Sequence, residues 1–364
     1  MVYAITAKLA DAKRVIDVLQ SDSLLDKEFQ FKKTKTTISF PVIAPIAIGE
    51  TINGATCKEV ADDFFTKTAR SLTLKQALKS ILTAEQLEKL KTAYDTVGTI
   101  AILEIDNELR EKEKEIANAL ILTNANIKTV LRKDGAHQGQ YRTQPMKFLA
   151  GVDTRETMHV ESGVRMLVDV EQVYFSPRLS TERLRIANLV KAAENSKNTM
   201  DTRENIMVFF SGAAPYCAVI GKKTQAKSIV GIEINPIAHK YAQETIHANK
   251  LKNVHLFCGD VHKVLPLLLD HKHLAQDIPR TYDRIIMNLP KSAHEYLDDA
   301  LSISKRGTII HYYDFLHEDE FDTAIQRIDA ACKKHELKYK VLGIYTCGAQ
   351  GIRTYRICVD VEIL

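Results

Sequence analysis

The fold of this chain is decided by the stretch Tyr282-Asp283-Arg284-Ile285-Ile286-Met287-Asn288-Leu289-Pro290-Lys291. Its apolar run has the length of a buried parallel strand, and the run ends abruptly at Asn288. Pro290 cannot donate a backbone hydrogen bond to a sheet, and it biases Leu289 toward an extended conformation. We therefore expect the strand to end here and the Asn288 amide to enter the crevice in which open parallel sheets bind ligands.

An asparagine followed two residues later by proline at such a strand end is where amino-group and ring-nitrogen methyltransferases hold the nitrogen that they alkylate. The tripeptide Asn288-Leu289-Pro290 therefore indicates methyl transfer to a base. Taken alone, it is equally compatible with an ordinary exit from a strand into a loop. The neighbouring strands decide between these two interpretations.

Upstream, a short apolar run at residues 206–210 leads into a turn of small residues, Ser211-Gly212-Ala213-Ala214-Pro215-Tyr216. This turn has the place of a nucleotide-binding loop, although only Gly212 remains where such loops often carry three glycines. The next apolar strand, residues 228–232, ends in Glu233-Ile234-Asn235-Pro236. Glu233 follows the turn by roughly 20 residues, which is the spacing of an acid that binds ribose hydroxyls.

A third strand, Val254–Cys258, follows a segment with helical spacing from Ile237 to Asn249 and ends in Gly259-Asp260. An acid at this position can accept a hydrogen bond from the exocyclic amino group of adenine. Polar groups at the ends of successive strands favour a cofactor site over a purely structural sheet.

The chain continues with an apolar segment at 307–313, an acid-rich helix from Glu318 to Lys334, and two alternating segments near 339–345 and 353–361. Gly348 and Gly351 separate the last two segments, which are predicted to form a hairpin. Alternating strands and helices with a terminal hairpin predict an α/β fold with the Rossmann-like sheet of class I S-adenosylmethionine-dependent methyltransferases, which has seven strands. The parallel sheet of nicotinamide dehydrogenases has no such hairpin.

The 364 residues include 50 Lys and Arg against 46 Asp and Glu, so the net charge says little about a polyanionic partner. Six cysteines without a CxxC spacing argue against zinc and against a disulfide framework, and we expect no metal. The sequence has neither a run of about 18 apolar residues nor the pattern of a signal peptide at its start. A cytoplasmic monomer without membrane association is expected.

Two or three domains are expected for a chain of this length. Residues 1–66 combine a helical stretch from Ala7 to Leu19 with an alternating segment, Thr36–Val42, and are predicted to form a small accessory domain. A linker is expected near residues 67–73. A second α/β domain is predicted for residues 70–165, and the catalytic domain for residues 166–364. The predicted elements before the catalytic domain are a helix at 74–94, a strand at 99–105, a helix at 111–122, a strand at 127–131 and further strands at 158–170.

Immediately before the catalytic sheet lies the segment Tyr174-Phe175-Ser176-Pro177-Arg178-Leu179-Ser180-Thr181-Glu182-Arg183. In a plain structural interpretation Ser180 is the N-cap of a helix. Glu182 then pairs with Arg178 or Arg185 across a helix turn, a contact that is worth only about 0.2–0.5 kcal/mol.

Together with Tyr141-Arg142-Thr143-Gln144 and Asp283–Pro290, this segment resembles the archaeal and eukaryotic family of tRNA (guanine-N1)-methyltransferases. The resemblance extends from about residue 70 to the end and is least distinct in the first 65 residues. It implies methyl transfer from S-adenosylmethionine to the guanine immediately 3′ of the tRNA anticodon, at position 37. It also implies that tRNA is bound at its anticodon stem-loop, while the first domain contacts the outer corner of the tRNA.

The resemblance implies that Glu182 is the proposed general base and that Arg142 is the proposed stabiliser of the guanine oxygen. The chemistry suits both roles, because guanine N1 must lose its proton as the methyl arrives, and negative charge then develops on the oxygen. Asn288 is expected to fix the angle of the base. The alternatives are that Arg142 binds a phosphate or is solvated, and that Tyr174 is a core aromatic residue.

The expected cofactor site combines the strand-end residues with Tyr174 and Arg178, and its members are Tyr174, Arg178, Ser211, Gly212, Ala213, Glu233, Asn235, Asp260, Val261, Asn288 and Pro290. Two other functions remain open. The first is a wyosine-pathway relative that transfers an aminocarboxypropyl group or methylates a tricyclic base. The second is a non-catalytic RNA-binding protein with a degenerate cofactor pocket, which the single glycine of the turn would favour.

Overall fold

The computed structural model describes residues 2–26, 29–44, 51–52, 55–61, 63–65, 72–196, 203–270 and 278–364. The chain divides into two compact units, Met1–Gln76 and Ala77–Leu364, which we describe separately. Of the linker expected near residues 67–73, only Leu72 and Thr73 lie within the described residues. In the described parts of the chain, no helix is long and apolar enough to cross a membrane.

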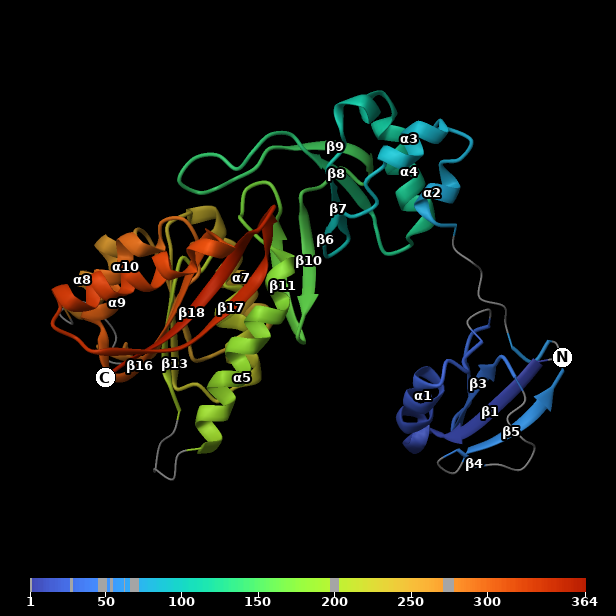
Figure 1. The fold of residues 1–364 in the computed structure, drawn as a ribbon, viewed down its shortest axis with the longest axis horizontal. Coiled ribbons are helices and arrows are strands. Elements are labelled where there is room, and N and C mark those ends of the chain that lie inside the picture. Colours follow the sequence, from blue (N-terminus) through green and yellow to red (C-terminus); the bar gives the residue numbers. More distant parts are fainter. Residues whose placement is uncertain are drawn as a thin grey trace. The chain divides into compact units, whose positions relative to one another are not determined.

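The first unit is a five-stranded sheet of order β2-β3-β1-β5-β4 with a helix, α1 (Figure 1). The helix predicted from Ala7 begins only at Ala12, because Ala7 pairs with Ile38 inside the first strand and is buried there. The alternating segment at 36–42 is confirmed as a strand. The elements are β1 (Val2–Lys8), α1 (Ala12–Ser21), β2 (Lys32–Lys33), β3 (Thr37–Val42), β4 (Thr51–Ile52) and β5 (Ala55–Val60).

The chain then forms a four-stranded sheet of order β6-β7-β8-β9. The single helix predicted at 74–94 is wrong, because Thr83 and Gln86 form a capping box that starts a second short helix. The strand β9 was not predicted. The elements are α2 (Leu74–Ala77), α3 (Ala84–Lys89), β6 (Asp95–Val97), β7 (Ile100–Leu103), α4 (Glu113–Thr123), β8 (Thr129–Lys133) and β9 (Met146–Gly151).

The further strands predicted at 158–170 form a two-stranded hairpin of β10 (Glu156–Glu161) and β11 (Val164–Asp169). The turn between β6 and β7 is held against β10 by two hydrogen bonds. The Gly98 N–H donates to Nδ1 of His159 at 3.2 Å, and the Thr99 N–H donates to Oγ1 of Thr157 at 3.0 Å. These contacts fix the four-stranded sheet relative to the hairpin.

The large sheet has seven strands in the order β14-β13-β12-β15-β16-β18-β17. Adjacent strands from β14 to β16 are parallel, while β18 runs antiparallel to both of its neighbours. This topology confirms the predicted fold class. The strands are β12 (Asn205–Phe209), β13 (Ser228–Glu233), β14 (Val254–Cys258), β15 (Tyr282–Met287), β16 (Ser304–His317), β17 (Tyr339–Gly351) and β18 (Thr354–Ile363).

Helices cover both faces of this sheet (Figure 1). Alternate strand residues point to opposite faces, so Ile286 packs with the first helix layer and Ile285 with the second. The first layer contains α5 (Ser180–Ser196), α6 (Pro215–Lys223) and α7 (Pro236–Ala248). The second layer contains α8 (Val261–Leu269), α9 (Leu297–Ser302) and α10 (Phe321–Lys334).

The terminal hairpin turns later than predicted. Gly348 and Gly351 both belong to β17, and the turn lies at Ile352 and Arg353, where Arg353 has a left-handed φ of 52°. Strand β18 pairs with β16 over residues 354–362, and β18 therefore brings Arg356 toward the carboxyl end of β16.

Candidate active site

A cavity of about 370 Å³ lies at the carboxyl ends of the central parallel strands. It brings together most of the residues predicted to form the cofactor and base sites. The predicted residues that line it are Arg142, Tyr174, Ser211, Gly212, Glu233, Asn235, Asp260, Val261 and Asn288.

Glu233 at the end of β13 is tied to the small-residue turn by its carboxylate. One oxygen accepts the Gly212 N–H at 2.7 Å, and the other accepts the Asn235 N–H at 2.8 Å. Burial raises the pKa of Glu233, and the backbone N–H groups of Asn235 and Gly212 oppose that shift. Gly212 itself has a left-handed φ of 57°, a conformation that glycine adopts without steric cost.

Two predicted site residues also begin helices. The Asn235 side chain caps α7 by accepting the Ile237 N–H at 2.9 Å, and the Asp260 side chain caps α8 by accepting the His262 N–H at 3.0 Å. Each polar group at a strand end is therefore held in place by the helix that follows it.

Asn288 presents a buried acceptor that the protein leaves unused. Its Oδ1 atom has no hydrogen-bond partner among the described residues, and the same is true of the Ser211 hydroxyl. An unpaired buried polar atom costs about 1–3 kcal/mol. Because both residues line the cavity, these atoms indicate a bound group that supplies hydrogen-bonding partners.

Arg142 reaches the cavity from the loop between β8 and β9. Its Nη2 donates to the backbone oxygen of Pro290 at 2.9 Å, which joins this loop to the end of β15. Burial lowers the pKa of Arg142, since burial disfavours the charged guanidinium. Pro290 thus contributes its carbonyl to Arg142 and does not line the cavity, contrary to its predicted place in the cofactor site.

A second cavity of about 570 Å³ shares part of its wall with the first, including Arg142, Tyr174 and Arg356. Its basic groups are Lys133, His137, Arg142, Arg178, Lys291 and Arg356. Arg178, which was expected in the cofactor site, lines this second cavity and donates to Asp95 at 2.7 Å.

Glu182 lies deeper than predicted. It is not among the described residues that line either cavity. Its carboxylate accepts two hydrogen bonds from Arg185, at 2.7 and 2.8 Å, and one from the Tyr313 hydroxyl at 2.5 Å. Glu182 therefore pairs with Arg185, which is one of the two partners expected in the plain structural interpretation. Its side chain does not line the cavity directly.

Two further predictions of this region need correction. Ser180 is not an N-cap, because a 3-10 turn at Pro177–Leu179 precedes it and Ser180 already has helical angles of −57° and −43°. Ala213 does not line the cavity, since it is 1% exposed and packs in the core beneath the turn.

Several lining residues were not predicted as site residues, among them Phe210, Tyr216, Ser292, Tyr296 and Arg356. Phe210 and Tyr216 flank the small-residue turn, so their position next to that turn was a usable signal. Arg356 reaches the cavity from β18, and its Nη2 donates to the Tyr174 hydroxyl at 2.8 Å. No local pattern signals a contact between residues so far apart in the chain.

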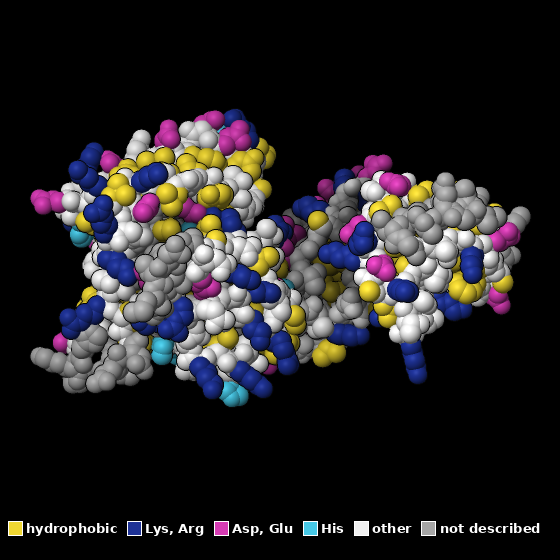
Figure 2. All heavy atoms as spheres, turned by 90° about the horizontal axis from the view of Figure 1, so that it is seen from below, with side chains coloured by type: hydrophobic (Ala, Val, Ile, Leu, Met, Phe, Trp, Pro, Cys, Tyr) yellow, Lys and Arg dark blue, Asp and Glu magenta, His cyan; other side chains and the backbone are white. Residues whose placement is uncertain are grey.

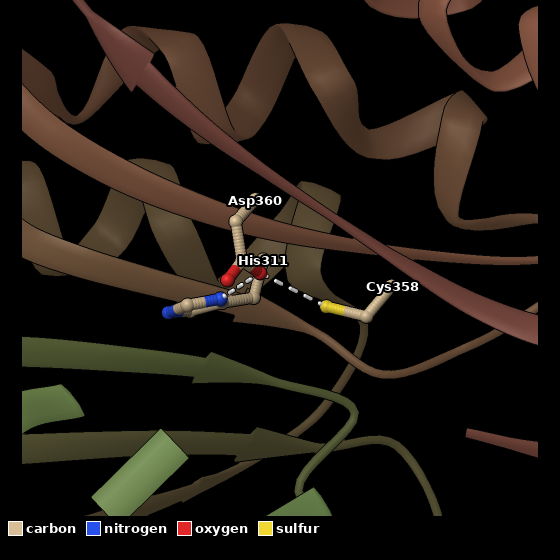
Figure 3. Close-up of side chains that lie close together, drawn as sticks. All are labelled: His311, Cys358 and Asp360. Atoms are coloured by element: carbon tan, nitrogen blue, oxygen red, sulfur yellow. Dashed lines mark hydrogen bonds and ion pairs between the residues drawn. The ribbon is translucent and has the colours of Figure 1, made fainter. Parts of the chain in front are cut away.

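His311, Cys358 and Asp360 form a buried cluster in which potential ligand atoms lie within 4.8 Å of one another (Figure 3). Arg284 donates to His311 Nε2 at 2.7 Å, so His311 carries its proton on Nδ1 and donates to Asp360 at 2.6 Å. Arg185 also donates to Asp360, at 2.7 Å. Two guanidinium groups on these atoms repel a further cation, and we interpret the cluster as a structural polar network.

The fold and the cavity define a class I S-adenosylmethionine-dependent methyltransferase: a seven-stranded sheet with one antiparallel strand, and acids at the ends of β13 and β14. Residues 157–342 match the model of the TRM5/TYW2 methyltransferase domain, and residues 74–154 match that of the TYW2 N-terminal domain. The chain belongs to the TRM5/TYW2 family of S-adenosylmethionine-dependent, tRNA-modifying enzymes. The non-catalytic alternative is thereby set aside.

The chain is similar to tRNA (guanine(37)-N(1))-methyltransferase Trm5b of Pyrococcus abyssi, with 38% identity over 75% of this chain and 76% of that protein. The crystal structure of that Trm5b covers 100% of this chain and 99% of its own, with a TM-score of 0.68. A structure titled as the complex of aTrm5 and tRNALeu has a TM-score of 0.66 at 25% identity and covers 99% of each chain. A tRNA(Phe) (4-demethylwyosine(37)-C(7)) aminocarboxypropyltransferase of Pyrococcus horikoshii is 29% identical over 67% of this chain and 79% of that protein.

Proposed function

We propose that this protein transfers a methyl group from S-adenosylmethionine to N1 of the guanine immediately 3′ of the tRNA anticodon. One observation carries the proposal: the unpaired amide oxygen of Asn288 and the guanidinium of Arg142 line the same cavity as Glu233. An acceptor and a cationic donor are the two groups that the edge of a guanine needs. The similarity to Trm5b of Pyrococcus abyssi supports this choice of base.

The residues at the strand ends suit the cofactor. Glu233 would bind the ribose hydroxyls, Asp260 the adenine amino group, and Ser211 with Gly212 the methionine end. When bound, S-adenosylmethionine supplies an electrophilic methyl group. The unpaired Ser211 hydroxyl provides one observation that the cavity fits such a polar ligand.

The target base would be held by Asn288 and Arg142. The Asn288 oxygen accepts a hydrogen bond from the base edge, which fixes the angle of the ring. The Arg142 guanidinium, already oriented by the Pro290 carbonyl, stabilises the negative charge that develops on the guanine oxygen when N1 loses its proton. Glu182 is the proposed final acceptor of that proton.

The second cavity would receive the RNA that flanks the base. Its Arg142, Lys291 and Arg356 side chains suit a phosphate backbone, whereas Lys133 and Arg178 pair with Glu104 and Asp95 of the same cavity. A base in a single-stranded loop is readily splayed into an adjoining pocket. In the lower part of Figure 2, Lys and Arg side chains also predominate over acidic ones on the larger unit. The small first unit would contact the outer corner of the tRNA, and the enzyme would act in the cytoplasm as a monomer.

A transfer of the aminocarboxypropyl group is the second candidate, favoured by the similarity to the Pyrococcus horikoshii transferase. The two candidates differ in which part of the cofactor must face the base. The presence of both Asn288 and Glu182 favours plain methyl transfer. In that reaction Glu182 would accept the ring proton and Asn288 would hold the ring nitrogen in place.

The test uses unmodified tRNA transcripts and S-adenosylmethionine labelled in its methyl group. We expect label to enter a transcript with guanine at position 37 and to be absent from a matched transcript with adenine there. Equal labelling of both transcripts would overturn the proposal. A parallel reaction uses S-adenosylmethionine labelled in its carboxypropyl chain. This label would enter the RNA only if the protein transfers the aminocarboxypropyl group.

A further inference from the structure

The position of Glu182 raises the question of how a proton from the cavity reaches it. Two tyrosine hydroxyls lie between the cavity and Glu182. The Tyr216 hydroxyl donates to the Tyr313 hydroxyl at 3.1 Å, and the Tyr313 hydroxyl donates to the Glu182 carboxylate at 2.5 Å. Tyr216 is itself one of the residues that line the cavity. A continuous hydrogen-bonded chain therefore links a wall of the cavity to the buried carboxylate.

The direction of this chain is set by its inner end. An ionised carboxylate only accepts hydrogen bonds, so the proton of Tyr313 must point toward Glu182. The Tyr313 oxygen is then the acceptor for the proton of Tyr216. Both hydrogens point from the cavity toward Glu182, which is the orientation needed to pass a proton inward.

The receiving carboxylate is held in place. Arg185 donates two hydrogen bonds to Glu182 and is itself fixed by Asp360 at 2.7 Å. The two tyrosine rings are 1% exposed and lie with centroids 6.2 Å apart, packed in the core beside α5. The burial of both rings and the hydrogen bond that each hydroxyl donates hold the two side chains in this arrangement.

We propose that Tyr216 and Tyr313 relay the N1 proton of the target guanine to Glu182. This inference rests on the proposed function. The N1–H bond breaks and an O–H bond forms at Tyr216, whose own proton passes to Tyr313, whose proton passes in turn to Glu182. The N1–carbon bond forms as the carbon–sulfur bond of the cofactor breaks with its electron pair left on sulfur. Both tyrosines end the step neutral, and Glu182 ends it protonated.

Burial supports a relay in which the protons move together. It raises the pKa of both Tyr216 and Tyr313 above the ordinary value of 10.0, which disfavours the phenolate form of either side chain. The nearby carboxylate of Glu182 acts in the same direction. A concerted shift avoids a buried phenolate.

The test variant is Tyr313→Phe, which removes the hydroxyl and keeps the ring. The relay predicts that single-turnover methyl transfer slows by about 10²-fold, the contribution of a proton-transfer group. The matched control is Tyr312→Phe on the same strand. Tyr312 is buried against the opposite helix layer, and its hydroxyl also donates to a carboxylate, Asp314, at 2.7 Å. The control is expected to retain the rate of the unaltered protein.

Binding and isotope measurements separate the relay from a structural effect. Titration of Tyr313→Phe with tRNA and with S-adenosylmethionine should give the dissociation constants of the unaltered protein. In mixtures of light and heavy water, the single-turnover rate of the unaltered protein should depend on deuterium content along a curve, since several protons move together. A linear dependence, or a Tyr313→Phe variant as fast as the control while Glu182→Gln is slow, would overturn the relay. Failure of the unaltered protein to methylate guanine 37 would instead overturn the proposed function.

Discussion

At the scale of single residues, the cavity is lined by polar side chains that stand at the ends of parallel strands. Glu233, Asp260 and Asn288 were predicted because each follows an apolar strand, and all three line the cavity. The position of Glu182 was not predictable in this way. Its orientation depends on Arg185 and on Tyr313, which lies on a distant strand. The helical spacing predicts that Arg185 can pair with Glu182, but no local pattern predicts the hydrogen bond from Tyr313 to Glu182.

Replacement of Glu233 by alanine tests the cofactor site. A hydrogen bond to a charged group contributes about 1.5–3 kcal/mol, so we expect the dissociation constant for S-adenosylmethionine to rise by about 10- to 100-fold. Calorimetric titration measures it. The control is Glu244→Ala, on the exposed side of the helix that follows Glu233. Equal affinity of the two variants would remove Glu233 from the cofactor site.

His311 gives a prediction for pH. Burial lowers its pKa below the ordinary value of 6.5, although the hydrogen bond from His311 to Asp360 opposes this. Below about pH 6.5 the unfolded chain therefore binds a proton here that the folded chain does not. The free energy of unfolding should thus fall as the pH drops below about 6.5. Nitrogen NMR at pH 7 should show a neutral ring with its proton on Nδ1, and a doubly protonated ring there would contradict this assignment.

At the scale of elements, the sequence predicted what alternation and turn residues determine locally. The strands from 206 to 287 and the final hairpin were found because each is a compact apolar or alternating run. The strands β1, β2, β4, β5, β6 and β9 were missed, since their pairing partners rather than their own patterns decide them. The helix at 74–94 was predicted too long, because helical periodicity continues across the Thr83 cap.

The turn between β6 and β7 provides an element-scale test. Gly98 has a left-handed φ of 55°, and a Cβ there would lie 2.6 Å from the backbone oxygen of Met158. We expect Gly98→Ala to lower the free energy of unfolding by about 1–3 kcal/mol through crowding, beyond the cost of a left-handed alanine. Urea unfolding measures the difference from Gly163→Ala, where φ is 77° and a Cβ would meet open space. Equal losses of unfolding free energy in the two variants would show that Gly98 is not tightly packed against Met158.

At the scale of the whole molecule, the described chain separates into a small unit and a larger one that holds both cavities. The small unit has its own core, which includes Ile5, Val15, Leu19 and Phe40. The cofactor site therefore depends on the larger unit alone. The sequence predicts a small first domain at residues 1–66 and two further domains, and the role of the small domain comes only from the resemblance to the family.

Removal of residues 1–71 tests this division. We expect the remaining chain to bind S-adenosylmethionine with unchanged affinity, because every residue of the proposed cofactor site is retained. Its affinity for full-length tRNA should fall, while its affinity for an isolated anticodon stem-loop should not. Titrations with the three ligands provide the comparison. An equal loss of affinity for both RNAs would refute contact between the small unit and the outer corner.

Mass spectrometry of the nucleosides from a tRNA transcript, after incubation with the protein and S-adenosylmethionine, tests the central claim most directly. The account predicts a single new nucleoside, guanosine methylated at N1, which digestion places immediately 3′ of the anticodon. An aminocarboxypropyl adduct, a methyl group on another atom of the base, or unchanged guanosine at that position would contradict it.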